Sequence, residues 1–339
     1  MTRNKASRIN DLSPDPFHEQ ARMPPPRTVR LLGGRFHFDS NSPKLLRIVD
    51  SAYARLPQHR LPGVARDFKV SLYLTPSSRS NLQPPSLALL NGAGYLGGAT
   101  HRSTFVVLSP AQRSALIVVA QKMLRFPYHV RYEFLEFAVF TLAARAQDLV
   151  PLHAACIGQN DKGLLLMGGS GAGKSTVALH SLLAGLDLLS EDSVFVSADT
   201  LLATGVSNFL HVRAESLRWI DRPSDRTVIR RSPVIRRRSG VEKFEVDIRR
   251  KRFCVAEAPP QIVGIVFLST RHAGSGPLLS RLSRTATLKK LVEAQPYAAR
   301  QPQWHIFRDK ILRLKSFELL RGTHPRESVA ALQSLLGDA

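Results

Sequence analysis

Between Leu164 and Thr176 the chain reads Leu-Leu-Leu-Met-Gly-Gly-Ser-Gly-Ala-Gly-Lys-Ser-Thr. The four apolar residues are typical of a buried strand. The rest satisfies the pattern G-x-x-x-x-G-K-[ST], from Gly168 to Ser175. Val177 to Ala184 then has helical character, and Gly185 stands where a helix C-terminal glycine belongs. A strand, a glycine-rich loop and a helix in this order predict a phosphate-binding loop.

Each residue type in this loop has a physical reason. Glycines allow dihedral angles that gather several backbone N–H groups into one concavity, and they let phosphate oxygens approach closely. The following helix directs the positive end of its dipole at the same point. Lys174 is expected to neutralise the β and γ phosphates, and the Ser175 hydroxyl to ligate Mg²⁺. The predicted nucleotide-binding set is Gly168, Gly169, Ser170, Gly171, Ala172, Gly173, Lys174, Ser175 and Thr176.

A second group of residues bears on the fate of the γ phosphate. The next apolar run, Leu186 to Leu189, ends in Ser190-Glu191-Asp192. Beside a phosphate loop, one of two adjacent carboxylates can hold Mg²⁺ while the other accepts a proton from an attacking hydroxyl. A solvated acidic turn is the common alternative for a Glu-Asp pair, and the nearby loop favours the catalytic interpretation.

From His153 to Val194 the sequence resembles the HPr kinase/phosphorylase family, bacterial P-loop kinases that phosphorylate a serine of a small carrier protein. In that family a histidine precedes the loop and two acids followed by x-Val close the segment. The resemblance implies that Asp192 is the general base and that His153 lies near the transferred phosphoryl group. It implies that Glu191 is a metal-site carboxylate or one that supports the metal ligands. It also implies ATP and Mg²⁺ as cofactors and is compatible with a homo-oligomer.

The sequence departs from that family downstream. Members carry an acid followed by Arg-Gly, which serves metal binding and the phosphorylase reaction, whereas Phe209 to Leu217 has no such pair. Phosphorylase activity is therefore in doubt, and Arg213 and Glu215 are candidates for a partial substitute. The ending from Phe317 to Pro325 resembles divergent HPr-kinase-like proteins of peptide-modification systems, among them kinases of lasso-peptide precursors.

The remaining chain is predicted to form two domains behind an arm. Residues 1–27 are expected to be a flexible, basic and proline-rich arm. Residues 28–150 are predicted to be a small α+β domain that recognises the substrate, with strands in Val29–Asp39, Phe68–Leu74 and Thr104–Leu108, a helix from Ser109-Pro110 to Leu124, and a helix over Tyr132–Ala146.

Residues 151–339 are predicted to be an α/β P-loop kinase domain that resembles the C-terminal domain of HPr kinase. Beyond the loop and the acid pair, strands are expected at Lys243–Ile248, Ile262–Leu268 and Leu314–Leu319. Helices are expected at Ala286–Ala294, capped by Thr285, and at Arg326–Leu336, behind Pro325.

Composition narrows the class of protein. The 339 residues are 43% apolar and 22% charged, as in a folded protein. No apolar run approaches the roughly 20 residues of a membrane span, and no secretory h-region follows the basic N-terminus, so a cytoplasmic protein without a membrane partner is expected. Cys156 and Cys254 have no spacing typical of a disulfide framework or a zinc site.

The formal net charge of +22 favours polyanionic partners. Fourteen basic residues stand against six acidic ones from Arg213 to Arg252, and the densest part, Arg230 to Arg238, is predicted to be a loop. Such a stretch can grip an acidic peptide, bind nucleic acid, or form a solvated surface. Aromatic residues are nearly absent from it, which argues against stacking on single-stranded bases and makes nucleic acid the less favoured partner.

Two function classes follow. In the first, the chain is an ATP-dependent serine kinase whose substrate is a small protein or peptide, for example a ribosomal-peptide or lasso-peptide precursor. In the second, it is a nucleotide-switched ATPase that contacts nucleic acid or another acidic partner. Asp192→Asn separates the two, because only the kinase needs that carboxylate for transfer.

Overall fold

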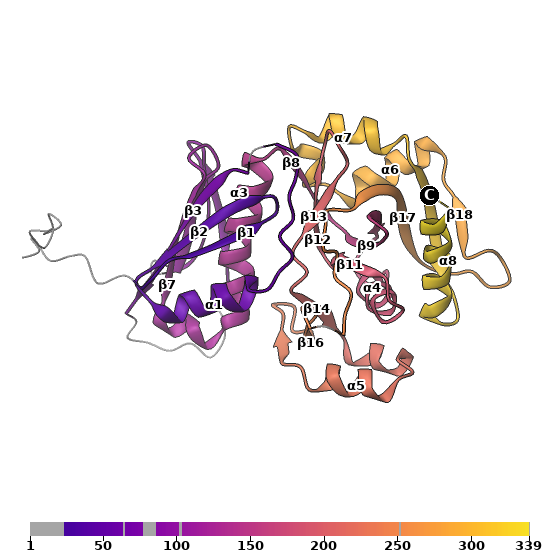
Figure 1. Cartoon of the computed structure of the whole chain (residues 1–339), viewed down its shortest axis with the longest axis horizontal. Coiled ribbons are helices and arrows are strands. Elements are labelled where there is room, and N and C mark those ends of the chain that lie inside the picture. Colours follow the sequence, from indigo (N-terminus) through magenta and orange to yellow (C-terminus); the bar gives the residue numbers. More distant parts are fainter. Residues whose placement is uncertain (1–23, 64, 77–85, 102–103, 251, 339) are drawn as a thin grey trace, which may run out of the picture.

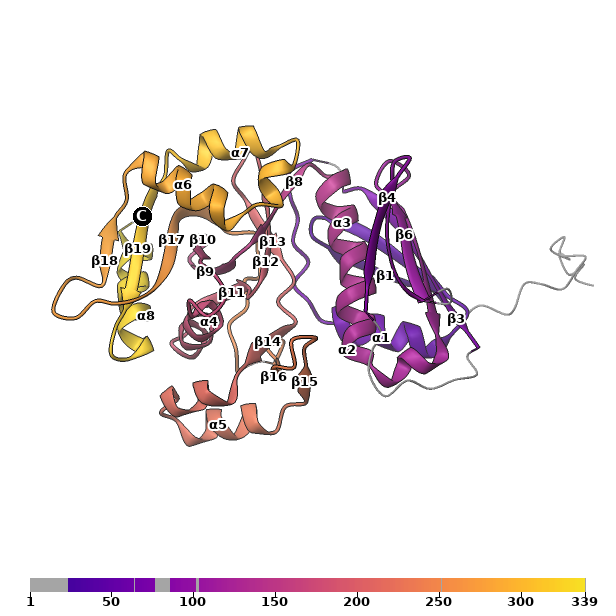
Figure 2. The same ribbon diagram turned by 180° about the vertical axis from the view of Figure 1, so that it is seen from behind.

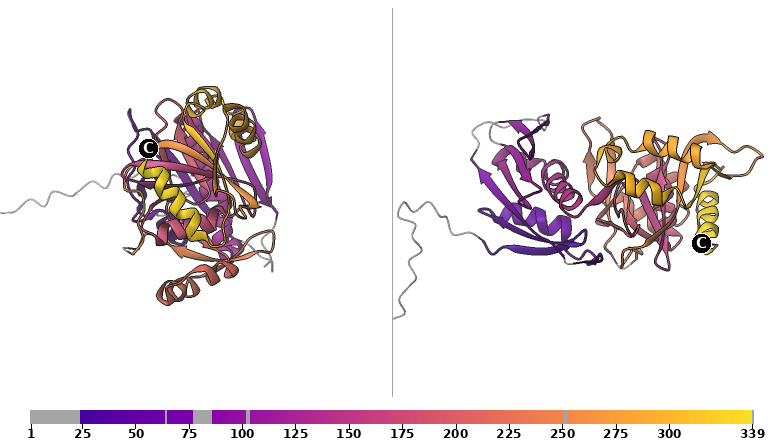
Figure 3. Two further views of the ribbon diagram at one scale, coloured as in Figure 1. Left: turned by 90° about the vertical axis from the view of Figure 1, so that its right-hand side faces the viewer. Right: turned by 90° about the horizontal axis from the view of Figure 1, so that it is seen from above.

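The structure is a computed structural model that describes residues 24–63, 65–76, 86–101, 104–250 and 252–338. Within these ranges the chain is a mixed α/β protein with four β-sheets. Figure 1 and Figure 3 show the elements up to α3 beside those from β8 onward. Most of the predicted N-terminal arm lies outside the described residues, and Arg27 already begins a strand. None of the described helices combines the length and hydropathy needed to cross a membrane.

The first sheet has seven strands. Their order is β1 (Arg27–Leu31), β2 (Gly34–Ser40), β3 (Asp67–Thr75), β7 (Ser114–Ala120), β6 (Thr104–Ser109), β5 (Tyr95–His101) and β4 (Ala88–Gly92). Alternation places Phe36 and Phe38 of β2 in the core while Arg35 stays exposed. Helices α1 (Pro43–Tyr53) and α3 (Phe137–Ala146) cover one face (Figure 2).

The helix predicted from Ser109 to Leu124 is wrong. The segment makes a turn and returns as β7, pairing with β6 in the register Ser109↔Ser114. Ala115, Ile117 and Val119 of β7 are buried, and Ser114, Leu116 and Val118 are more exposed, which is the period of a strand. Only a 3₁₀ turn, η1 (Gln121–Arg125), follows.

The helix predicted over residues 132–146 is confirmed, although it begins earlier. It comprises α2 (Pro127–His129), a π-helical segment η2 (Val130–Glu136) and then α3. Helix α1 was not predicted.

The second large sheet positions the glycine-rich loop. Its order is β11 (Asp187–Ser190), β9 (Ala155–Gln159), β10 (Lys162–Met167), β17 (Gln261–His272), β19 (Lys315–Arg321) and β18 (Leu279–Arg281). Strand β17 runs parallel to both β10 and β19. Leu164 and Leu166 pack toward α4 (Lys174–Leu183) and α8 (Pro325–Gly337), and Leu165 and Met167 toward α6 (Arg284–Ala294) and α7 (Trp304–Ile311). Both faces of β10 are therefore covered, as its continuous apolar run predicts.

Two small sheets complete the architecture. The strand order of one is β13 (Ala203–Gly205), β12 (Ser193–Ser197) and β8 (Leu149–His153). The strand order of the other is β14 (Phe209–Val212), β16 (Glu242–Asp247) and β15 (Val234–Arg236). The remaining elements are helix α5 (Pro223–Arg230) and the 3₁₀ turns η3 (Ala214–Trp219) and η4 (Ala298–Arg300).

Two sequence predictions in this part need correction. The basic loop Arg230–Arg238 contains β15, which pairs with β16. The α6 cap is Ser283 instead of Thr285, because the Ser283 hydroxyl accepts the N–H of Ala286 at 3.2 Å.

Candidate active site

The glycine-rich loop joins the end of β10 to the start of α4. Gly171 and Gly173 have φ angles of 80° and 101°, in the left-handed region that favours glycine, and the space in front of both is open. The Lys174 amine donates a hydrogen bond to the Gly168 carbonyl at 2.5 Å. Burial lowers the pKa of Lys174, although Asp192 and Glu191 oppose that shift. The loop thus offers an open turn, a cation and a helix N-terminus at one place.

The same sheet edge adds an arginine that sequence reasoning missed. Strands β10, β17 and β19 are parallel, so their carboxyl ends meet beside the loop, where open α/β sheets bind ligands. Arg321, the last residue of β19, donates from Nη2 to the Gly171 carbonyl at 2.6 Å. No local motif marks this residue; its role follows from the strand order alone.

Glu191 lies behind the loop and is 6% exposed. Its Oε1 accepts the Ser175 hydroxyl at 2.6 Å, and its Oε2 accepts the backbone N–H of His211 at 2.6 Å. Burial alone raises the pKa of a carboxyl, but the bonds from His211 and Ser175 outweigh it and the pKa of Glu191 is lowered. Glu191 is therefore a fixed carboxylate joined to the loop serine.

Asp192 faces the other way and is more open to solvent. Its Oδ1 lies 3.1 Å from Nδ1 of His153, because β8 and β12 pair with Ser193 opposite His153. Burial opposes ionisation, yet His153, Arg237 and Lys174 together lower the pKa of Asp192 to about 2. The side chains of His153 and Asp192 are 57% and 31% exposed, so a ligand can reach both.

A glutamine that sequence reasoning also missed holds His153 in place. Gln295 ends α6 and is 2% exposed. Its Oε1 accepts the backbone N–H of His153 at 2.8 Å, and its Nε2 donates to the His153 carbonyl at 3.0 Å.

Behind Glu191, a series of buried charged residues, His211, Glu245 and Arg131, leads to the π-helical segment η2. His211 Nδ1 lies 3.4 Å from Glu191 Oε2, and its Nε2 lies 3.3 Å from Glu245 Oε1. Burial lowers the pKa of a histidine, but the two carboxylates prevail and raise the pKa of His211 to about 8. Both terminal nitrogens of Arg131 then donate to Glu245, and its Nε lies 3.4 Å from Glu136.

The structure brings together the loop, Lys174, Ser175, the acid pair and His153. It does not join Arg213 or Glu215 to them, since in the described ranges no hydrogen bond or ion pair links either residue to the acid pair. His211 occupies that position instead. His211 lies 20 and 34 residues from Glu191 and Glu245 in the sequence, and no local pattern predicts that the three side chains meet.

The donor set fits Mg²⁺. A serine hydroxyl and a carboxylate are oxygen ligands, which this cation prefers, and Mg²⁺ takes its remaining ligands from phosphates and water. In the described part of the chain no group of three or more His, Cys, Asp or Glu side chains forms a complete protein cage for a metal.

No family model matches the chain, and no curated protein matches it. Among solved structures it is similar to the Hpr(Ser) kinase/phosphatase from Coxiella burnetii, with 12% sequence identity over 56% of this chain and 99% of that chain and a TM-score of 0.27. This is at most a distant structural similarity.

Proposed function

We propose that the chain is an ATP-dependent serine kinase that transfers the γ-phosphate to a serine of a small protein or peptide. The observation that carries this proposal is the divergence of two adjacent carboxylates. Glu191 is buried and accepts the Ser175 hydroxyl, whereas Asp192 is partly exposed and lies beside His153. Two carboxylates that are adjacent in the sequence therefore have environments suited to different tasks.

Glu191 and Ser175 are the residues that would hold Mg²⁺. A bound Mg²⁺ would supply positive charge that neutralises the charge developing on the phosphate oxygens. Glu191 suits this role because its second oxygen is fixed by the backbone of His211, so the carboxylate is already oriented and ionised.

Asp192 would orient the serine hydroxyl and accept its proton. The serine oxygen forms a bond to the γ-phosphorus, the bond from that phosphorus to the bridging oxygen breaks, and ADP leaves. A carboxylate with a pKa of about 2 is a weak base for a free hydroxyl. It suffices here because the phosphoryl transition state is loose, so the proton moves mainly as the new bond forms. His153 would hold the carboxylate on the acceptor side of the loop.

Two cations lie at the glycine-rich loop, where negative charge would develop on the transferred phosphoryl group. Lys174 is tied to Gly168, and Arg321 is tied to Gly171, both through carbonyl oxygens of the loop itself. Each can exchange this bond for a phosphate oxygen, because a charged acceptor binds a cation more strongly than a carbonyl does. We assign residues 151–339 to the P-loop kinase domain and substrate recognition to residues 28–150, whose helix supplies Arg131 to the series of buried charged residues.

Transfer of label from γ-labelled ATP in the presence of Mg²⁺ tests the proposal. Small proteins and peptides of the source cell, including candidate ribosomal-peptide precursors, serve as acceptors. Stable label on a serine is the expected result. Label found only as free phosphate favours the nucleotide-switched ATPase instead.

A further inference from the structure

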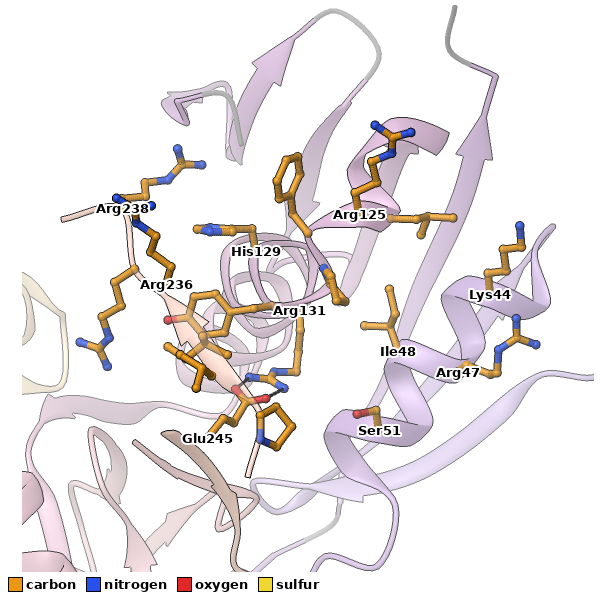
Figure 4. A pocket seen from close by; sticks show the side chains of 18 of the residues that line it. Lys44, Arg47, Ile48, Ser51, Arg125, His129, Arg131, Arg236, Arg238 and Glu245 are labelled. Atoms are coloured by element: carbon orange, nitrogen blue, oxygen red, sulfur yellow. Dashed lines mark hydrogen bonds and ion pairs between the residues drawn. The ribbon is translucent and has the colours of Figure 1, made fainter. Parts of the chain in front are cut away.

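A cavity of about 970 Å³ opens between the N-terminal helices and the basic strand β15. One wall comes from α1, a second from the segment around Arg125 and Tyr128, and a third from residues 233–240 (Figure 4). Figure 4 places Lys44 and Arg47 on the α1 side, Arg236 and Arg238 on the opposite side, and the Arg131–Glu245 pair between them.

The walls of this cavity are strongly basic. In the described part of the chain no ion pair neutralises five of the lining cations, Lys44, Arg47, Arg125, Arg236 and Arg237. Glu245 is the acidic residue among the lining residues, and Arg131 and His211 already hold it. Among the described residues, the buried Nε atom of Arg237 has no hydrogen-bond partner, although the nearby Asp192 and Glu191 carboxylates attract its charge. Lys44, Arg47, Arg125 and Arg236 are exposed, so acidic side chains of a ligand can form ion pairs with them.

The cavity adjoins the hollow that holds the candidate catalytic acids. Arg131 lines it and also lines a smaller hollow of about 40 Å³ that contains Glu191 and Asp192. Tyr128 of the large cavity stacks on Tyr132 of the small one, with ring centroids 5.5 Å apart. A segment bound in the cavity therefore lies next to the hollow that contains Asp192.

We propose that this cavity binds an acidic segment of the peptide substrate and so presents a nearby serine to Asp192. The inference rests on the proposed kinase function for the role of the serine, whereas binding of the acidic segment stands on the cavity alone. Apolar side chains between the cations, Ile48, Phe126 and the 57% exposed Val234, fit a peptide with mixed side chains. Cations on three separate walls of a concavity suit a short chain better than the regular phosphate rows of a duplex.

Binding to the full chain tests the inference without any need for catalysis. The probe is a fluorescent peptide with one serine and several glutamates, compared with the same peptide carrying glutamine for glutamate and with a single-stranded oligonucleotide of equal charge. The variant is Lys44→Glu/Arg47→Glu. The matched control is Lys289→Glu/Arg313→Glu, which makes the same charge change at exposed positions outside the cavity.

The inference predicts that the acidic peptide binds the wild type at least about tenfold more tightly than the glutamine peptide. The cavity variant should lose about tenfold in affinity for the acidic peptide, and the control much less, because long-range charge effects are screened by salt. Equal affinity for both peptides, or equal losses in both variants, overturns it. Tighter binding of the oligonucleotide, lost in the cavity variant, overturns it in favour of nucleic acid.

Label transfer in the same samples separates the two proposals. Phosphorylation of the glutamine peptide as fast as the acidic one refutes the acidic-segment inference and leaves the kinase standing. Selective binding of the acidic peptide without any phosphoserine refutes the kinase and leaves the binding site standing.

Discussion

Gln295 exchanges two hydrogen bonds with the backbone of His153, at 2.8 and 3.0 Å, across 142 residues of chain. The amide thus fixes the end of β8, on which His153 faces Asp192. The uncharged side chain of Gln295 thus sets the position of His153 in the candidate active site.

We expect Gln295→Ala to lower the transfer rate about tenfold through misplacement of His153 and Asp192, with little change in KM for ATP. Two lost bonds should also lower the free energy of unfolding by about 1–3 kcal/mol. Steady-state kinetics and urea unfolding measure both. Gln301→Ala is the control, because the buried Gln301 side chain donates to the Tyr297 carbonyl, away from His153. Equal kinetic losses in both variants would show that the effect is general destabilisation.

His211 should make stability fall on the alkaline side. The folded pKa of about 8 exceeds the usual 6.5, so the protonated ring contributes stability that is complete below pH 6.5 and is lost as the pH rises through 8. The shift corresponds to about 2 kcal/mol.

Urea unfolding of the wild type and of His211→Asn between pH 6 and 9 measures this contribution. The wild type should lose about 2 kcal/mol more than the variant over that interval. Parallel curves for the two proteins would mean that His211 does not carry the charge.

Arg321→Ala should reduce the transfer rate about a hundredfold while ATP still binds, because a cation aimed at developing charge acts mainly in the transition state. Its loss also frees the Gly171 carbonyl. The readout is kcat compared with KM for ATP, and Arg281→Ala on the exposed edge strand β18 is the control. An unchanged kcat would leave Arg321 only as a brace for the loop.

Local signals correctly predicted the strand β10, the glycine turn and the helix α4, because the three follow one another directly in the sequence. The same kind of signal failed elsewhere. Ser42-Pro43 begins α1, whereas Ser109-Pro110 begins a turn, although both dipeptides favour a helix start. What differs is the sequence that follows. Leu45, Leu46, Val49 and Ala52 have helical spacing, whereas residues 115–120 form a short, unbroken apolar run that contains three β-branched residues.

The rest of the candidate site could not be predicted locally. Gln295, Arg321 and Glu245 reach it from remote parts of the chain through strand order and helix packing, and each is an ordinary polar residue in its own segment. The pKa of His211 is raised because its ring lies between the carboxylates of Glu191 and Glu245. Glu245 is more than thirty residues from His211 in the sequence. Tertiary structure, and no motif, makes these residues functional candidates.

The most direct test of the kinase account compares the wild type with Asp192→Asn in two measurements, ATP binding and phosphoserine formation on an acceptor peptide. The amide keeps the size of the side chain and removes the proton acceptor. We expect ATP affinity to be retained and phosphoserine formation to fall at least about a hundredfold. Transfer at the wild-type rate in the variant, or an absence of phosphoserine in the wild type despite ATP binding, would contradict the account.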